Sequence, residues 1–179
     1  IQTDAFEWST RFNAGINQNE ILSLSEGQEA LNPGDILPTA VGKSLEAWKV
    51  PLWAGVNPAD GRPMYYDQDG NITYRPAEAD DQFFDGGEED VEGGFGTRLS
   101  YKGLSLDAFF QFSYGGTSLP NTERAFLSNQ GAFSAGLDLL NDRWREPGDV
   151  TDVARAVPSG VYPFADDFNS FSTYWLYDS

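Results

Sequence analysis

The chain has 179 residues, of which 40% are hydrophobic and 15% aromatic, too many large apolar side chains for a disordered segment. Its formal net charge is −17, which argues against nucleic acid as a partner because a phosphate backbone needs a basic surface. The sequence contains no cysteine and no histidine, which excludes disulfides, thiolate or histidine metal sites and catalytic triads, and we predict that the chain is not an enzyme.

The first predicted element is a long β-strand over residues 4–17. Even positions from Phe6 to Ile16 are mostly aromatic or aliphatic, whereas odd positions from Glu7 to Gly15 are polar, charged or small. A period of two over about eleven residues is typical of a strand with one apolar and one hydrated face.

A long segment rich in turn residues follows the first strand. Asp60-Gly61 and Asp69-Gly70 separate short runs of β-forming residues, so residues 48–75 are predicted to form a small meander. The next stretch, residues 80–94, holds seven acidic residues and is predicted to be a solvated loop. Whether its part 80–92 binds cations is left open.

Two more alternating runs follow, over residues 95–101 and 104–114. The two-residue step Lys102-Gly103 joins them, which predicts an antiparallel hairpin because glycine supplies the positive φ of a tight turn. Beyond Tyr114 the alternation ends, and we predict loops with a short helical turn around residues 132–140.

The long alternating strands have two explanations. A half-buried sheet in a soluble protein is the more general one. Strands of about ten residues, aromatic residues near the strand ends, and one short turn among long connections are instead typical of an outer-membrane barrel. About three strands cannot close a barrel, which needs about eight. Either the loops cover the sheet, or the chain is one piece of a larger wall.

Several motifs in one order resemble a known family. The stretches are WKVPLWAGVNPADGRPMYYDQDGNITY, GGFGTRLSYKGLSLDAFFQFSYG, NDRWREPGD, ARA and YWLYDS, preceded by WSTRFNAGINQNEILSL and GKSLEAWKV. Together they resemble the C-terminal barrel half of SusC/RagA-type TonB-linked outer-membrane transporters. Tyr174 stands where this family often has Arg, and Pro51 interrupts a usual Gly-Tyr-Lys run.

The resemblance implies a fold and a function. We expect an all-β, antiparallel fragment of a large, 22-strand-type transmembrane β-barrel domain covering residues 1–179, with extracellular loops at 18–94 and 115–173 and no plug domain. The whole protein is expected in the bacterial outer membrane, importing oligosaccharides or peptides. Its expected partners are a SusD-like surface lipoprotein, membrane lipid and TonB. TonB is expected to act through the missing N-terminal part.

The barrel interpretation assigns each strand face an environment. Polar and charged residues are expected to face the lumen: Arg11, Arg98, Asp107 and Gln111. Apolar residues are expected to face lipid: Phe6, Trp8, Phe12, Leu104, Leu106, Phe110 and Phe112. Arginine at the lipid midplane would cost about 2–4 kcal/mol, so its absence from the apolar face fits this assignment.

Two weaker sites and a rival function complete the predictions. The loop aromatics that are candidates for stacking on sugars or peptide side chains are Trp48, Trp53, Tyr65, Tyr66 and Trp144. Asp67, Asp69 and Asn71 faintly resemble a calcium loop, but an EF-hand has glycine at its sixth position, not its fourth. No other cofactor is expected. The rival function is a secreted or surface β-sheet carbohydrate-binding module.

Overall fold

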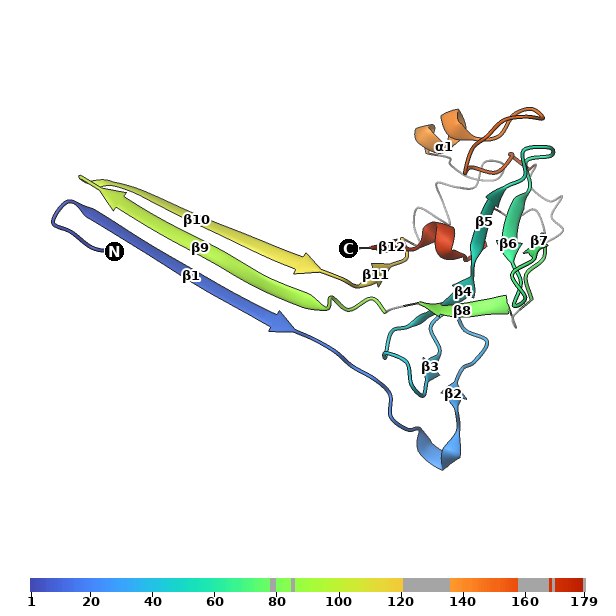
Figure 1. Ribbon diagram of the computed structural model, residues 1–179, viewed down its shortest axis with the longest axis horizontal. Coiled ribbons are helices and arrows are strands. Elements are labelled where there is room, and N and C mark those ends of the chain that lie inside the picture. Colours follow the sequence, from blue (N-terminus) through green and yellow to red (C-terminus); the bar gives the residue numbers. More distant parts are fainter. Residues whose placement is uncertain (78–79, 85, 121–135, 158–167, 169, 179) are drawn as a thin grey trace.

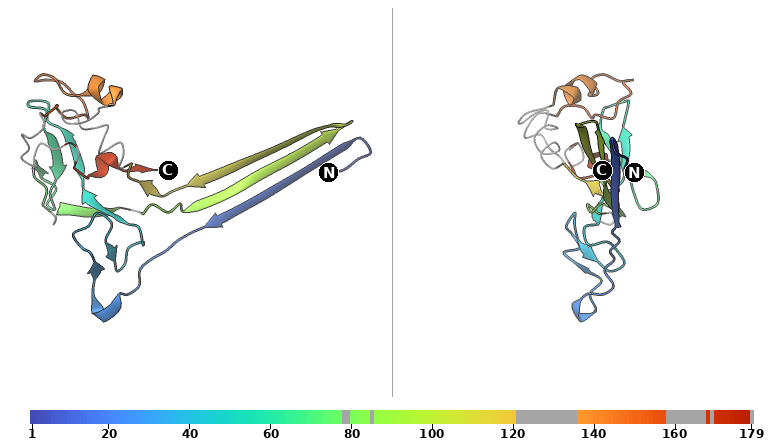
Figure 2. Two further views of the ribbon diagram at one scale, coloured as in Figure 1. Left: turned by 180° about the vertical axis from the view of Figure 1, so that it is seen from behind. Right: turned by 90° about the vertical axis from the view of Figure 1, so that its left-hand side faces the viewer.

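The computed structural model describes residues 1–77, 80–84, 86–120, 136–157, 168 and 170–178. A long, narrow three-stranded sheet extends away from a body of shorter strands and loops (Figure 1). The N-terminus lies at the far end of the sheet, and the C-terminus lies where the sheet meets the loop body (Figures 1 and 2).

The long sheet consists of β1 (Phe6–Ile16), β9 (Val91–Tyr101) and β10 (Leu104–Tyr114), each 11 residues long. β9 lies in the centre and pairs antiparallel with both neighbours. It begins at Val91, four residues before the predicted start at 95, because Glu92, Gly93 and Gly94 also pair on both sides. The two glycines hide the alternation that identifies a strand in the sequence.

Two tight turns close the far end of the sheet. Lys102 and Gly103 have φ of 46° and 88°, the two positive values that a type I′ hairpin requires, and the predicted hairpin is confirmed. A second turn at Asp4-Ala5 is closed by the Thr3 N–H, which donates to the Phe6 carbonyl. The strand predicted from residue 4 therefore begins only at Phe6. The Lys102 N–H donates to the Ala5 carbonyl, which places the two turns side by side.

The loop body contains the predicted meander. β5 (Trp53–Val56), β6 (Pro63–Tyr66) and β7 (Ile72–Thr73) form a three-stranded antiparallel sheet, with the two Asp-Gly pairs in its connections. β4 (Trp48–Pro51), the first part of the predicted meander, is not in this sheet and pairs with β8 (Asp81–Phe84) in a separate two-stranded sheet.

The prediction of a solvated loop over residues 80–94 is wrong at both ends. Asp81–Phe84 forms β8, where Phe84 and Phe83 lie opposite Trp48 and Lys49, and residues 91–94 belong to β9. The density of acidic residues hides both strands in the sequence.

Shorter elements complete the described part of the chain: η1 (Ser25–Gly27), β2 (Ala30–Leu31), β3 (Thr39–Ala40), β11 (Thr117–Ser118), α1 (Leu137–Asp142), η5 (Thr173–Trp175) and β12 (Tyr177–Asp178). Helix α1 begins directly after Gly136, later than the helical turn predicted over 132–140, of which residues 132–135 lie outside the described residues. The prediction of an all-β, antiparallel architecture is confirmed for the sheets of the described chain.

The apolar core lies in the loop body and not in the long sheet. Its buried residues are Val56, Val153, Ala154, Phe168 and Trp175. The long sheet is one layer thick in the described chain, and large side chains on it are exposed. Among the described residues, no helix is long and apolar enough to cross a membrane.

Candidate functional site

The register of the long sheet separates its side chains into two faces. Phe12, Phe95 and Phe110 share one rung, and the rungs two residues away hold Thr10, Thr97 and Ala108, and Ala14, Gly93 and Phe112. The intervening rungs hold the polar residues. All residues predicted to face lipid therefore lie on one face, and the four residues predicted to face the lumen, Arg11, Arg98, Asp107 and Gln111, lie on the other.

The apolar face is open to its surroundings. Leu106, Phe110 and Phe112 are 61%, 60% and 38% exposed, so no second layer of the described chain covers them. Rings from different strands stack along this face: the Phe12 and Phe112 centroids are 6.1 Å apart, and those of Phe95 and Phe110 are 6.4 Å apart.

The indole N–H of Trp8, which lies on this face, has a hydrogen-bond partner on the neighbouring strand. The indole Nε1–H of Trp8 donates to Oγ1 of Thr97 at 3.0 Å. This pairing suits an apolar environment, where an unsatisfied donor is costly.

The polar face carries one charged pair and one aromatic ring. Nη2 of Arg11 lies 3.9 Å from Oδ1 of Asp107, and both side chains are more than half exposed. The Arg11 guanidinium carbon lies 5.9 Å from the ring centroid of Phe109. Phe109, the break in the alternation of 104–114, is therefore a partner of Arg11.

Glycines in β9 make room for these two side chains. A Cβ on Gly96 would lie 2.5 Å from Nε of Arg11, and a Cβ on Gly94 would lie 2.8 Å from Cζ of Phe109. Arg11 and Phe109 thus lie across the central strand from opposite sides, and both glycines are buried beneath them.

A shallow hollow of about 460 Å³ remains beside these side chains on the polar face. Asn13, Glu92, Phe109 and Gln111 border it, and the backbone of Gly93 and Gly94 forms its floor. Only Gln111 of this set was predicted as a site residue. Two sequence features could have indicated the hollow: Phe109 is an aromatic residue at a position where the alternation of 104–114 expects a polar one, and Gly93 and Gly94 are adjacent glycines.

The predicted loop aromatics pack within the loop body. Trp53 contacts the rings of Tyr65 and Tyr174, with centroids 5.5 and 5.1 Å away, and Tyr65 is only 3% exposed. Nε1 of Trp48 donates to the Thr117 carbonyl and Nε1 of Trp144 to the Pro58 carbonyl. Tyr66 is half-buried in β6. None of these residues lines the hollow beside Phe109, and their contact with a ligand stays a prediction.

The residues of the faint calcium loop form a turn. Oδ1 of Asp67 accepts the backbone N–H groups of Asp69 and Asn71, at 2.9 and 2.7 Å. These hydrogen bonds, that from Asn71 first, lower the pKa of the Asp67 carboxyl. In the described residues, no group of three or more acidic side chains is placed to hold a metal ion.

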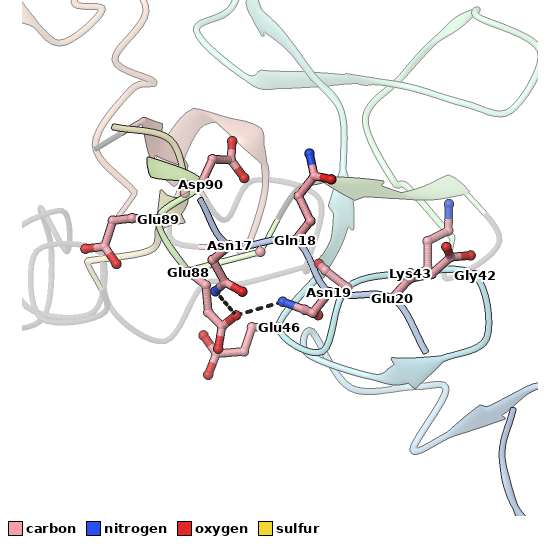
Figure 3. Close-up of a pocket in the computed structure, with 13 residues that line it drawn as sticks. Asn17, Gln18, Asn19, Glu20, Gly42, Lys43, Glu46, Glu88, Glu89 and Asp90 are labelled. Carbon is pink, nitrogen blue, oxygen red and sulfur yellow. Dashed lines mark hydrogen bonds between the residues drawn. The ribbon is translucent and has the colours of Figure 1, made fainter. Parts of the chain in front are cut away.

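A polar cleft of about 470 Å³ lies where the long sheet meets the loop body (Figure 3). It is formed by the segment after β1, the 42–46 loop and the segment before β9, and its charged lining residues are Glu20, Lys43, Glu46, Glu88, Glu89 and Asp90. One oxygen of Glu88 accepts from both Asn17 and Asn19, at 2.9 and 2.7 Å. Sequence reasoning missed this cleft because its residues come from four separate segments, the fourth of which contributes Gly116.

Known proteins that resemble this chain are receptors and transporters. No protein-family model matches the chain. TonB-dependent receptors P3 and P26 of Formosa agariphila are 28% and 27% identical to it, over 87% of its length. The structure of the RagAB peptide transporter matches 99% of the chain with a TM-score of 0.77 and 25% identity. The RagAB peptide importer in its "closed-closed" state matches 99% with a TM-score of 0.74 and 26% identity.

The chain is similar to a segment of SusC/RagA-type TonB-dependent transporters. The resemblance expected from the sequence motifs is thereby confirmed, and it extends over nearly the whole chain. The chain spans 17% and 18% of the length of the two receptors and 20% of the RagAB chain that it matches. The matched proteins are receptors and transporters and not enzymes, and the family is one of outer-membrane proteins.

Proposed function

We propose that β1, β9 and β10 are adjacent strands in the wall of an outer-membrane transporter barrel. The two-faced register carries this proposal, because each strand has 11 residues and keeps one apolar face throughout. A tilted strand needs about 9–11 residues to cross a bilayer, and its side chains alternate between lipid and lumen. A 22-strand-type barrel would accommodate the sheet as one part of its wall.

Backbone pairing along the edge of β1, and between segments just beyond the end of β10, is in line with this arrangement. On the edge of β1, residues 1–3 run back antiparallel to the strand: the Trp8 N–H donates to the Ile1 carbonyl, and the Ile1 amino group donates to the Trp8 carbonyl. Beyond the outer end of β10, Thr117 and Ser118 pair with Asp178 and Tyr177 of β12. A wall in lipid needs further strands on both edges, because every backbone polar group must be paired there.

The turns suggest an orientation. The two-residue turns Asp4-Ala5 and Lys102-Gly103 lie at one end of the sheet, and the loop body lies at the other (Figure 1). Outer-membrane barrels have short periplasmic turns and long extracellular loops. We therefore assign the turn end to the periplasm and the loop body to the cell surface.

The proposed activity of the whole protein is TonB-dependent import of peptides or oligosaccharides. The structural match to a peptide transporter favours peptides. In RagAB the transporter is paired with a surface lipoprotein. By analogy, the loop body would face a SusD-like lipoprotein, and TonB would act through a part of the transporter outside this chain.

Paired cysteine substitutions in the intact transporter test the wall assignment. This chain contains no cysteine, and any cysteine elsewhere in the transporter is first replaced by serine. Leu106→Cys and Phe110→Cys then report on one face of the sheet, and Asp107→Cys and Gln111→Cys report on the other. In proteoliposomes, a lipid-soluble maleimide should label the first pair and a water-soluble maleimide the second. Equal labelling of both pairs by the water-soluble reagent would contradict a wall.

The rival function, a water-soluble carbohydrate-binding module, predicts a covered apolar face. The exposure of Leu106 and Phe110 in the described chain disfavours it. Purification of the native protein as a detergent-free monomer would favour the module over the barrel.

A further inference from the structure

We propose that the hollow beside Phe109 on the polar face of the long sheet is a contact site for transported peptides. The inference rests on the proposed function, because this face borders a transport path only if the sheet is a barrel wall. The residues that would carry it are Asn13, Glu92, Phe109 and Gln111.

The sheet register places two carboxamides on either side of the hollow. Asn13, Gly94 and Gln111 share one rung, with Gly94 in the centre. Neighbouring strands lie about 4.8 Å apart, so the backbones of β1 and β10 are separated by roughly 10 Å at this rung. The ring of Phe109 covers Gly94, so the hollow lies beside this ring and between the two carboxamides.

The polar groups around the hollow lack partners. Within the described chain, the side chains of Asn13, Gln111 and Glu92 make no hydrogen bond or ion pair, although each is exposed on the same face. Phe109 is the one large apolar side chain on the polar face of these three strands, and it is 57% exposed. An aromatic ring and three unpaired polar groups thus converge on one hollow.

The chemistry of this set suits a peptide. A carboxamide offers one donor group and one acceptor, which match the C=O and N–H of a peptide unit. The Glu92 carboxylate can accept hydrogen bonds from an ammonium or guanidinium group, and the ring of Phe109 can contact an apolar or cationic side chain. Sugar hydroxyls could also bind the carboxamides, but only a cationic ligand gains a charge-assisted hydrogen bond between two ionised groups at the Glu92 carboxylate. A peptide bearing a positive charge is therefore the favoured ligand.

Co-purification of peptides with the intact transporter tests the site. The protein in detergent is incubated with a tryptic digest of serum albumin, whose peptides carry an amino terminus and mostly end in Lys or Arg, and retained peptides are quantified by mass spectrometry. The double variant Asn13→Ala with Gln111→Ala should retain roughly fivefold less peptide, as expected for the loss of one or two hydrogen bonds. Glu92→Gln should reduce retention of the most basic peptides selectively.

The matched control is Ser9→Ala with Ser105→Ala, on the same face nearer the tight turns, which should retain peptides as the wild type does. Equal retention by the double variant and the wild type, or no retention by the wild type, would overturn the proposal. Loss of maltoheptaose binding in place of peptide binding would reassign the hollow to glycans. Outer-membrane fractionation of the same preparations is read separately, so a failure of the barrel assignment is distinguishable from a failure of this site.

Discussion

Trp8 and Thr97 are joined by a hydrogen bond across β1 and β9, from the indole Nε1–H to Oγ1 at 3.0 Å. Both residues lie on the apolar face, where most of the neighbouring side chains are hydrocarbon. A strand face that meets lipid cannot rely on water to satisfy an indole N–H. The pair therefore allows a large aromatic side chain to stand on this face without an unpaired donor.

The substitution Thr97→Val should test the value of this hydrogen bond. It keeps the side-chain shape but removes the acceptor, and we expect a loss of about 1 kcal/mol in the stability of the intact transporter. Thr10→Val is the matched control, because Thr10 lies opposite Thr97 on the same face. Thermal unfolding followed by gel mobility compares the two variants, and equal midpoints would contradict the prediction.

Arginine substitutions at adjacent positions should distinguish the two faces. Phe110→Arg would place a charge on the proposed lipid face and should cost about 2–4 kcal/mol near the midplane, which reduces the amount of folded protein in the membrane. Gln111→Arg, one residue later on the hydrated face, should be tolerated. The folded fraction of each variant is measured in outer-membrane extracts. A tolerated Phe110→Arg would show that this face does not contact lipid.

Gly93 should be less replaceable than Gly15. A Cβ on Gly93 would clash with the backbone oxygen of Asn13, which cannot move without disturbing the sheet, whereas one on Gly15 would meet only Cγ of Glu92 at 3.9 Å. We expect Gly93→Ala to destabilise the sheet by about 1–3 kcal/mol. Gly15→Ala should leave it nearly unchanged. Protease resistance of the assembled protein provides the measurement, and equal resistance of the two variants would contradict the expectation.

The loop body should lose stability in strongly alkaline solution. Burial, followed by the charges of Tyr177, Asp152 and Asp142, raises the pKa of Tyr174 to about 12. Because the folded-state pKa exceeds the ordinary value of 10.0, the stabilisation is fully present below pH 10 and is lost as the pH rises towards 12. Tyr174→Phe should remove this part of the pH dependence. Tyrosinate absorbance and tryptophan fluorescence measure the titration and the unfolding; a Tyr174 that ionises near pH 10 would contradict the prediction.

Local sequence patterns determined the long strands and their faces. The period of two from Phe6 to Ile16 and from Leu104 to Tyr114 requires no knowledge of the remaining chain, because each side chain's direction follows from its position in an extended backbone. The same holds for the Lys102-Gly103 turn. The ordered motifs, which are also local, carried the resemblance to SusC/RagA-type transporters.

Tertiary structure alone decided which distant segments meet. The pairing of Trp48–Pro51 with Asp81–Phe84, the cleft around Glu88 and the hollow beside Phe109 each combine segments far apart in the chain. Glycine in β9 carries no side chain to mark a strand, so its role appears only when Arg11 and Phe109 are seen lying over Gly96 and Gly94. Such contacts depend on the register between strands, which alternation within a single strand does not specify.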